Sequence, residues 1–179
     1  MNRPPGQLPG RLAAGLLLAG SALTLAQSTD LDGNWVLAIG AGPTDLELVA
    51  SLQQDAANTI KDEYATKDVT PRLTFRCTPG NPEVTVLIDW QRFISSFNTE
   101  VGFKVDAGKS LWLKWGVDRS NKITLSRSAT DSQTLIEHLG DGESLQVEIS
   151  PYSESPVTVE FDLAGTANGL AQLRTECSR

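Results

Sequence analysis

Apolar residues occupy every second position along most of the chain from Leu46 onward, with polar residues between them. This alternation falls in segments 46–52, 73–77, 84–90, 101–105, 111–117, 123–125, 145–149 and 157–163. A period of two with a polar second face is typical of antiparallel sheet with one side on the core, whereas buried parallel strands read as unbroken apolar runs. The pattern therefore predicts a mainly β domain of the α+β class, arranged as an antiparallel β-sandwich-like structure.

Turn-forming residues separate these segments. The sequence Thr78-Pro79-Gly80-Asn81-Pro82 follows segment 73–77 and predicts that it forms a hairpin with segment 84–90. Further turns are expected at 106–109, 118–121 and 150–156. No repeat, linker or low-complexity segment interrupts the pattern, which indicates one domain.

Two segments depart from the period of two and predict short helices. Residues 130–139 begin with Thr130-Asp131-Ser132, which are good capping residues, and Gly140 follows as a helix terminator. From Thr166 to the C-terminus, Leu170, Leu173 and Cys177 recur at intervals of three and four, which is one helical face.

Residues 1–26 have the pattern of a secretory signal peptide. Arg3 and Arg11 supply positive charge, residues 12–25 are uncharged and rich in Leu and Ala, and Thr24-Leu25-Ala26 offers a small-residue cleavage site. We expect cleavage after Ala26, leaving a single domain of residues 27–179 in the periplasm or outside the cell. The apolar run is short and rich in Gly for a membrane span, so no membrane insertion is expected after cleavage, and a retained anchor is the alternative.

The charge of the chain argues against nucleic acid as a partner. The chain has 15 Lys and Arg against 22 Asp and Glu, a net charge of −7. Two of the basic residues lie in the predicted signal peptide, so 13 basic and 22 acidic residues remain after cleavage, a net charge of −9. An acidic surface has the wrong sign for the electrostatic attraction that dominates binding to nucleic acid or to anionic membranes.

Cys77 and Cys177 are the only cysteines. An even number in an exported chain predicts a structural disulfide. Cys77 shares its strand face with Leu73 and Phe75, and Cys177 shares its helix face with Leu170 and Leu173, so both thiols are expected to point into one interior. The bridge would staple the C-terminal helix onto the sheet.

The sequence offers no convincing catalytic, metal or cofactor site. His138 is the only histidine, it borders the apolar stripe of the first helix, and no Gly-x-Ser-x-Gly motif accompanies it. In Asp30-Leu31-Asp32-Gly33-Asn34 the glycine stands at the fourth position of the loop and no glutamate closes it, unlike a calcium-binding loop. We therefore expect no enzyme activity. A hydrolase with dispersed carboxylates would need an acidic cleft that the sequence cannot display.

One tryptophan stands out as a candidate contact residue. Trp90 and Trp115 are in register with the apolar faces and are expected in the core, whereas Trp112 lies between Leu111 and Leu113 and should point away from it. An outward tryptophan is either a contact with a partner or is covered by a helix. Trp35 opens the domain.

The order of several landmarks resembles the TagO/VasI family of periplasmic proteins associated with type VI secretion systems. These landmarks are Gly42-Pro43-Thr44-Asp45, Pro71-Arg72-Leu73-Thr74-Phe75-Arg76-Cys77, residues 83–90, residues 101–106, Trp115-Gly116-Val117-Asp118, Leu135-Ile136-Glu137-His138-Leu139, Ile149-Ser150-Pro151-Tyr152, residues 156–165 and Leu173-Arg174-Thr175-Glu176-Cys177. Family members tend to end in Cys-x-Trp, whereas this chain ends in Cys177-Ser178-Arg179. The resemblance implies a non-enzymatic accessory or binding protein of the bacterial envelope, whose partner is an envelope or secretion-system protein.

A small-molecule carrier of lipocalin-like character is the alternative function. Gly33-Asn34-Trp35 at the start of the domain and a helix at its end resemble that family. Eight alternating strands would suit a barrel whose interior holds one ligand. The two predicted helices and the lack of regular hairpin spacing count against this alternative.

Overall fold

The computed structural model describes residues 27–42 and 47–179, and their elements are mostly β-strands. The strands are β1 (Gln27–Asp30), β2 (Val36–Ala41), β3 (Leu48–Asp55), β4 (Ile60–Lys61), β5 (Asp68–Val69), β6 (Arg72–Cys77), β7 (Thr85–Asp89), β8 (Thr99–Val105), β9 (Ser110–Val117), β10 (Ile123–Leu125), β11 (Ser144–Ile149) and β12 (Val157–Asp162). The helices are α1 (Ala129–Leu139) and α2 (Thr166–Cys177), with a 3₁₀ turn, η1 (Asp32–Asn34), between β1 and β2. The predicted mainly β class with two short helices is confirmed.

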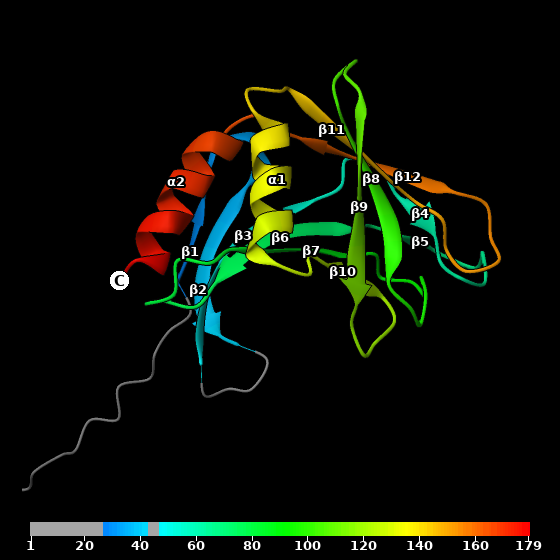
Figure 1. The fold of residues 1–179 in the computed structure, drawn as a ribbon, viewed down its shortest axis with the longest axis horizontal. Helices are drawn as coiled ribbons and strands as arrows, with labels where there is room; N and C mark the ends of the chain where they lie inside the picture. The colour runs from blue at the N-terminus through cyan, green and yellow to red at the C-terminus, as the bar shows by residue number, and fades with distance from the viewer. Residues whose placement is uncertain (1–26, 43–46) are drawn as a thin grey trace, which may run out of the picture.

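Ten strands form one antiparallel sheet in the order β1-β2-β3-β6-β7-β10-β9-β8-β11-β12, and β4 and β5 form a separate small ladder. The sheet turns sharply at β9. Residues 110–115 of β9 pair with β8, whereas Gly116 and Val117 pair with β10. Figure 1 shows β8 and β9 running steeply across the direction of β6 and β7. The sheet thus has two halves, β1-β2-β3-β6-β7-β10 and β9-β8-β11-β12, which is the sandwich-like arrangement made from one continuous sheet.

The alternating apolar residues of both halves meet in one core. The largest fully buried side chains include six aromatics: Trp35, Trp90, Trp115, Phe75, Phe103 and Phe161. Trp90 Nε1 donates to Thr124 Oγ1 at 2.9 Å, so the indole keeps a hydrogen bond although it is buried. The predicted core positions of Trp90 and Trp115 are confirmed, and the aromatic rings fill the core that the two halves of the sheet enclose.

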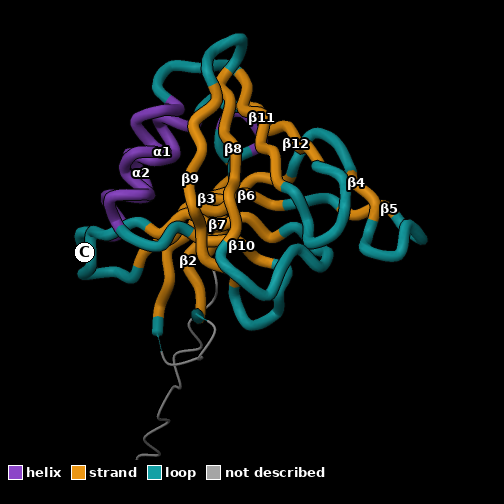
Figure 2. Tube along the Cα trace, turned by 45° about the vertical axis from the view of Figure 1, so that its right-hand side comes forward, coloured by secondary structure: helices purple, strands orange, loops and turns teal. Residues whose placement is uncertain are grey.

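The two helices lie side by side against the core (Figures 1 and 2). Helix α1 starts one residue earlier than expected, and its N-cap is Ser128, whose hydroxyl accepts from the Asp131 amide at 3.1 Å. Thr130–Ser132 therefore lie in the first turn, and Gly140 ends the helix as predicted. Helix α2 packs on β3 and β6, and at Gly169 a Cβ atom would lie 2.9 Å from the Leu52 methyls, so the glycine permits the close approach.

The predicted disulfide joins α2 to the sheet. Cys77 at the end of β6 and Cys177 at the end of α2 are bonded, with Cα atoms 5.7 Å apart and a sequence separation of 100. The Gly80 amide, in the turn after β6, also donates to the Cys177 carbonyl at 2.9 Å. Both ends of the bridge are buried in the core cluster, as the face pattern predicts.

The main sheet is open, with β1 and β12 at its two edges. The residues that follow β3 cover the edge of β12: the Ala57 amide donates to the Glu160 carbonyl at 2.8 Å, and the Asn58 side chain accepts from the Glu160 amide at 2.8 Å. Covering an edge in this way blocks pairing with another strand. The described strands do not close into the barrel that the carrier alternative requires.

Strands β1 and β2 were not expected from the sequence. The β2 sequence Val36-Leu37-Ala38-Ile39-Gly40-Ala41 is apolar on both faces, so it shows no alternation. The predicted signal peptide of residues 1–26 and Leu46 lie outside the described residues. Within the described part of the chain, no helix is long and apolar enough to span a membrane.

Candidate functional site

Three loops and a small ladder meet at one end of the sheet. Residues 90–98 follow β7, residues 118–122 join β9 to β10, residues 150–156 join β11 to β12, and β4 and β5 form the ladder. The backbone of residues 90–98 bonds to both neighbouring loops, because the Ile94 amide donates to the Asn121 carbonyl at 2.8 Å and the Tyr152 amide donates to the Ile94 carbonyl at 2.8 Å. Segments distant in sequence are thus tied together.

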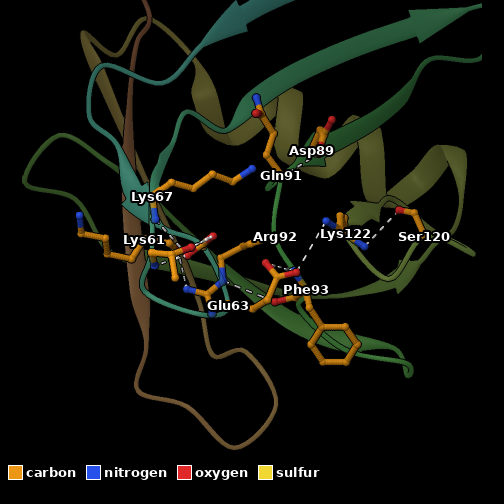
Figure 3. A network of polar contacts seen from close by, with 11 residues as sticks. Lys61, Glu63, Lys67, Asp89, Gln91, Arg92, Phe93, Ser120 and Lys122 are labelled. Atoms are coloured by element: carbon orange, nitrogen blue, oxygen red, sulfur yellow. Dashed lines mark hydrogen bonds and ion pairs between the residues drawn. The ribbon is translucent and has the colours of Figure 1, made fainter.

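Arg92 is the centre of this arrangement (Figure 3). Its side chain is only 3% exposed. Nη1 donates to the Lys61 carbonyl at 2.8 Å, and Nη2 donates to Glu154 Oε2 at 2.5 Å. A buried guanidinium is stable only when its charge is paired and its donors are bonded. Arg92 therefore fixes the loop 90–98 to the β4–β5 ladder and to the loop 150–156.

The carboxylate of Glu63 adds further contacts between the same loops (Figure 3). Glu63 Oε2 accepts from the Phe93 amide at 3.4 Å, and Glu63 Oε1 lies 3.7 Å from Lys122 Nζ. A hydrogen bond from its own backbone amide, then the Phe93 amide and the Lys122 charge, lower the pKa of Glu63 against the opposing effect of burial. The anionic form of Glu63 is thus favoured where it holds the loop.

Asp62 organises the turn between β4 and β5. Burial raises the pKa of Asp62, but the hydroxyl and amide of Thr66, at 2.8 and 2.7 Å, together with the Lys67 amide outweigh burial, so that the net pKa is lowered. A carboxylate bonded by several amides fixes the shape of a turn. The turn that carries Tyr64 is therefore held from within.

Exposed aromatic side chains stand on the segments that Arg92 connects. Tyr64 in the β4–β5 turn is 77% exposed, Phe97 is 70% exposed and Tyr152 is 65% exposed. Large exposed aromatics are enriched at the centres of protein interfaces, and rigid placement lowers the entropy cost of binding. We refer to Tyr64, Phe97 and Tyr152, with the loops that carry them, as the Arg92 loop surface. The charged groups of Arg92, Glu154 and Glu63 bond to one another's loops within the chain. The exposed aromatic side chains are therefore the part of this surface that can contact another molecule.

A pocket of about 450 Å³ lies at the ends of β3 and β12. Gln54 lines this pocket, and its buried Oε1 has no hydrogen-bond partner among the described residues. Two carboxylates also line it, but Asp55 is paired with Arg72 at 2.6 Å and raises the pKa of that arginine, and Asp162 accepts from the Ala164 amide at 2.8 Å. Both carboxylates of this pocket are therefore already engaged.

The other residues singled out from the sequence fall in separate places. His138 is half-buried in the last turn of α1, with Nε2 3.2 Å from the Phe103 carbonyl, where it links the helix to β8. Within the described ranges, no three His, Cys, Asp or Glu side chains are grouped so that they could hold a metal ion. Trp112 is 51% exposed, so a helix does not cover it, and its role as a partner contact stays a prediction.

Sequence reasoning missed the Arg92 loop surface. Gln91-Arg92-Phe93-Ile94 has no periodicity, and nothing local indicates that Arg92 is buried. The available signal was compositional: Phe93, Phe97 and Tyr152 lie in segments rich in Ser, Asn and Pro, where an aromatic residue has no strand face to bury.

No family model matches the chain, and no curated protein sequence matches it. In structure the chain is similar to invasion associated protein B from Bartonella henselae, with 15% sequence identity, coverage of 85% of this chain and 97% of that chain, and a TM-score of 0.47.

Proposed function

We propose that this chain is a non-enzymatic accessory protein of the bacterial cell envelope that binds another envelope protein through the Arg92 loop surface. The observation that carries the proposal is the placement of three exposed aromatic side chains on loops that a buried arginine holds together. A preorganised aromatic surface loses little conformational entropy on binding, which favours a protein partner. The β12 edge of the sheet is not available for pairing with a partner strand, because Ala57 and Asn58 already bond to the backbone of Glu160.

The disulfide supports a location outside the reducing cytoplasm. Structural disulfides persist in the periplasm and in secreted proteins and are rare in the cytosol. The bridge between Cys77 and Cys177 therefore agrees with the predicted signal peptide of residues 1–26 and with export to the periplasm or beyond.

The more specific role that we propose is assistance to a type VI secretion system. Its support is the resemblance of the landmarks between Gly42 and Cys177 to the TagO/VasI family. In that role the partner is a periplasmic part of the secretion apparatus, and the protein helps to place it.

Site-specific photocrosslinking in living cells tests the binding role. A benzophenone amino acid is incorporated at Phe97 or Tyr152, and as a control at Thr175, which is exposed on α2. We expect one discrete adduct from positions 97 and 152 and none from position 175. Absence of an adduct at both loop positions, or equal adducts at all three, would contradict the use of this surface.

A second experiment tests the secretion role separately. The gene is deleted in its own host, and assembly and firing of the type VI apparatus are followed by fluorescence of a sheath protein. We expect fewer firing events, restored by the wild-type gene but not by Phe97→Ser/Tyr152→Ser. Normal firing in the deletion strain would remove the secretion role while leaving the crosslinking result to decide the binding role.

A further inference from the structure

The outer face of the half-sheet β9-β8-β11-β12 carries one exposed aromatic ring. On these strands the apolar positions Val101, Phe103, Leu145, Val147, Val159 and Phe161 face the core, so the residues between them point outward. Trp112 lies on this outer face and is 51% exposed, whereas the other three tryptophans are fully buried. Neither Trp112 nor its neighbours on β8 and β11 belong to the Arg92 loop surface.

A glycine on the neighbouring strand fits beneath the indole. Trp112 is directly opposite Gly102 in the β8–β9 ladder. A Cβ atom at residue 102 would lie 2.8 Å from Trp112 Cη2, 2.9 Å from Cζ2 and 3.0 Å from Cζ3. The six-membered ring therefore rests on the backbone of β8, and the absence of a side chain at Gly102 is what makes this position available.

Charged side chains surround the ring in balanced numbers. Glu148 on β11 is opposite Gly102, Lys114 is two residues from Trp112 on β9, and Glu100 and Lys104 flank Gly102 on β8. These side chains, two acidic and two basic, form no hydrogen bond or ion pair with the rest of the described chain. The charged groups keep their donors and acceptors free, while their net charge is zero.

We propose that this face binds a neutral saccharide chain, with one sugar ring stacked on Trp112. A pyranose ring has an apolar face of C–H groups that matches a flat indole, and a rim of hydroxyls that needs both donors and acceptors. Glu148 and Glu100 accept hydrogen bonds from such hydroxyls, and Lys104 and Lys114 donate to them. A strongly anionic ligand is disfavoured, because the four charges nearest the ring cancel and the outward Glu160 and Asp162 on β12 add negative charge to the face.

Tryptophan fluorescence gives a selective test, because only Trp112 is open to a quencher in solution. Acrylamide quenching is measured with the oxidised, full-length exported protein in the presence of chitohexaose, cellohexaose or maltohexaose. We expect at least one of these probes to lower the quenching constant about twofold in a saturable manner, since a stacked sugar covers the exposed side of the ring.

Two variants and a control test whether this protection depends on Trp112 lying over Gly102. In Gly102→Ala the added methyl group displaces the indole, and we expect about tenfold weaker binding with an unchanged far-UV spectrum. Trp112→Ala, followed by isothermal titration calorimetry, should lose binding, whereas Leu48→Ala, which removes an exposed apolar side chain on β3, should bind as the wild type does.

Three results would overturn the proposal. The first is that none of the three oligosaccharides protects Trp112 at millimolar concentration. The second is that Gly102→Ala binds as well as the wild type, which would mean that the ring position is irrelevant. The third is protection by a hexa-arginine peptide but not by the saccharides, which would assign the face to a cationic peptide. None of these results bears on the Arg92 loop surface.

Discussion

The disulfide between Cys77 and Cys177 allows the most quantitative prediction. It joins β6 to the last residue of α2 and closes a loop of 100 residues. Both cysteines are buried, so Cys77→Ala/Cys177→Ala removes the bridge without placing a hydroxyl in the core. The double replacement leaves Leu170 and Leu173 to hold α2 against the sheet.

The magnitude follows from the size of the loop. Closing a loop of about 100 residues restricts the unfolded chain by about 4.7 kcal/mol in the chain-entropy model, and residual structure in the unfolded state reduces this figure. We expect the variant to lose about 3–4 kcal/mol of unfolding free energy. For a domain of about 150 residues, each kcal/mol shifts Tm by about 2–4 °C, so Tm should fall by about 10 °C.

Thermal and urea unfolding followed by circular dichroism measure this loss, with the wild type under reducing conditions as the matched comparison. Hydrogen exchange gives a local reporter, because the Gly80 amide bonds to the Cys177 carbonyl and should exchange faster when the end of α2 frays. Two free thiols in the oxidised wild-type protein, or superimposable melting curves for wild type and variant, would refute the reasoning.

Two further predictions concern buried and bonded charges. Glu154→Ala should lower the free energy of unfolding in urea by about 3 kcal/mol, because it leaves the buried Arg92 guanidinium unpaired. The double variant Arg92→Met/Glu154→Ala should lose less, because it buries no unpaired charge. A double variant less stable than Glu154→Ala would contradict this account. Hydrogen bonds from the backbone amides of Ser144 and Glu143 lower the pKa of Asp106 in the folded state. The ionised carboxylate therefore stabilises the fold above its unfolded pKa of about 4, and this stabilisation is lost as pH falls through the folded pKa. The difference in stability between wild type and Asp106→Asn should therefore shrink between pH 5 and pH 2 in acid-unfolding curves, and a difference that stays constant with pH would show that the carboxylate charge is not involved.

Much of the fold could be predicted because the relevant signals are local. Leu73, Phe75 and Cys77 alternate with polar residues, so their common face follows from strand geometry alone. The same reasoning placed Cys177 on the buried face of α2 and so predicted the disulfide. It failed for β2, where Ala38 and Gly40 leave no polar face to mark the strand.

The candidate surfaces depend on contacts that no local pattern encodes. Arg92 resembles any loop arginine in sequence, and its burial results from the meeting of segments that lie 31 and 62 residues away. The outward direction of Trp112 was predicted from its register, but its position over Gly102 depends on which strand pairs with β9.

The sequence by itself determined the mainly antiparallel sheet, its buried face, the two helices and the pairing of Cys77 with Cys177, because side-chain periodicity is fixed by the geometry of each strand and helix. The tertiary structure alone decided the strand order, the change of partner along β9, and which loops meet around Arg92. These features depend on the free energy of packing segments far apart in the chain, and that free energy is not carried by any one segment.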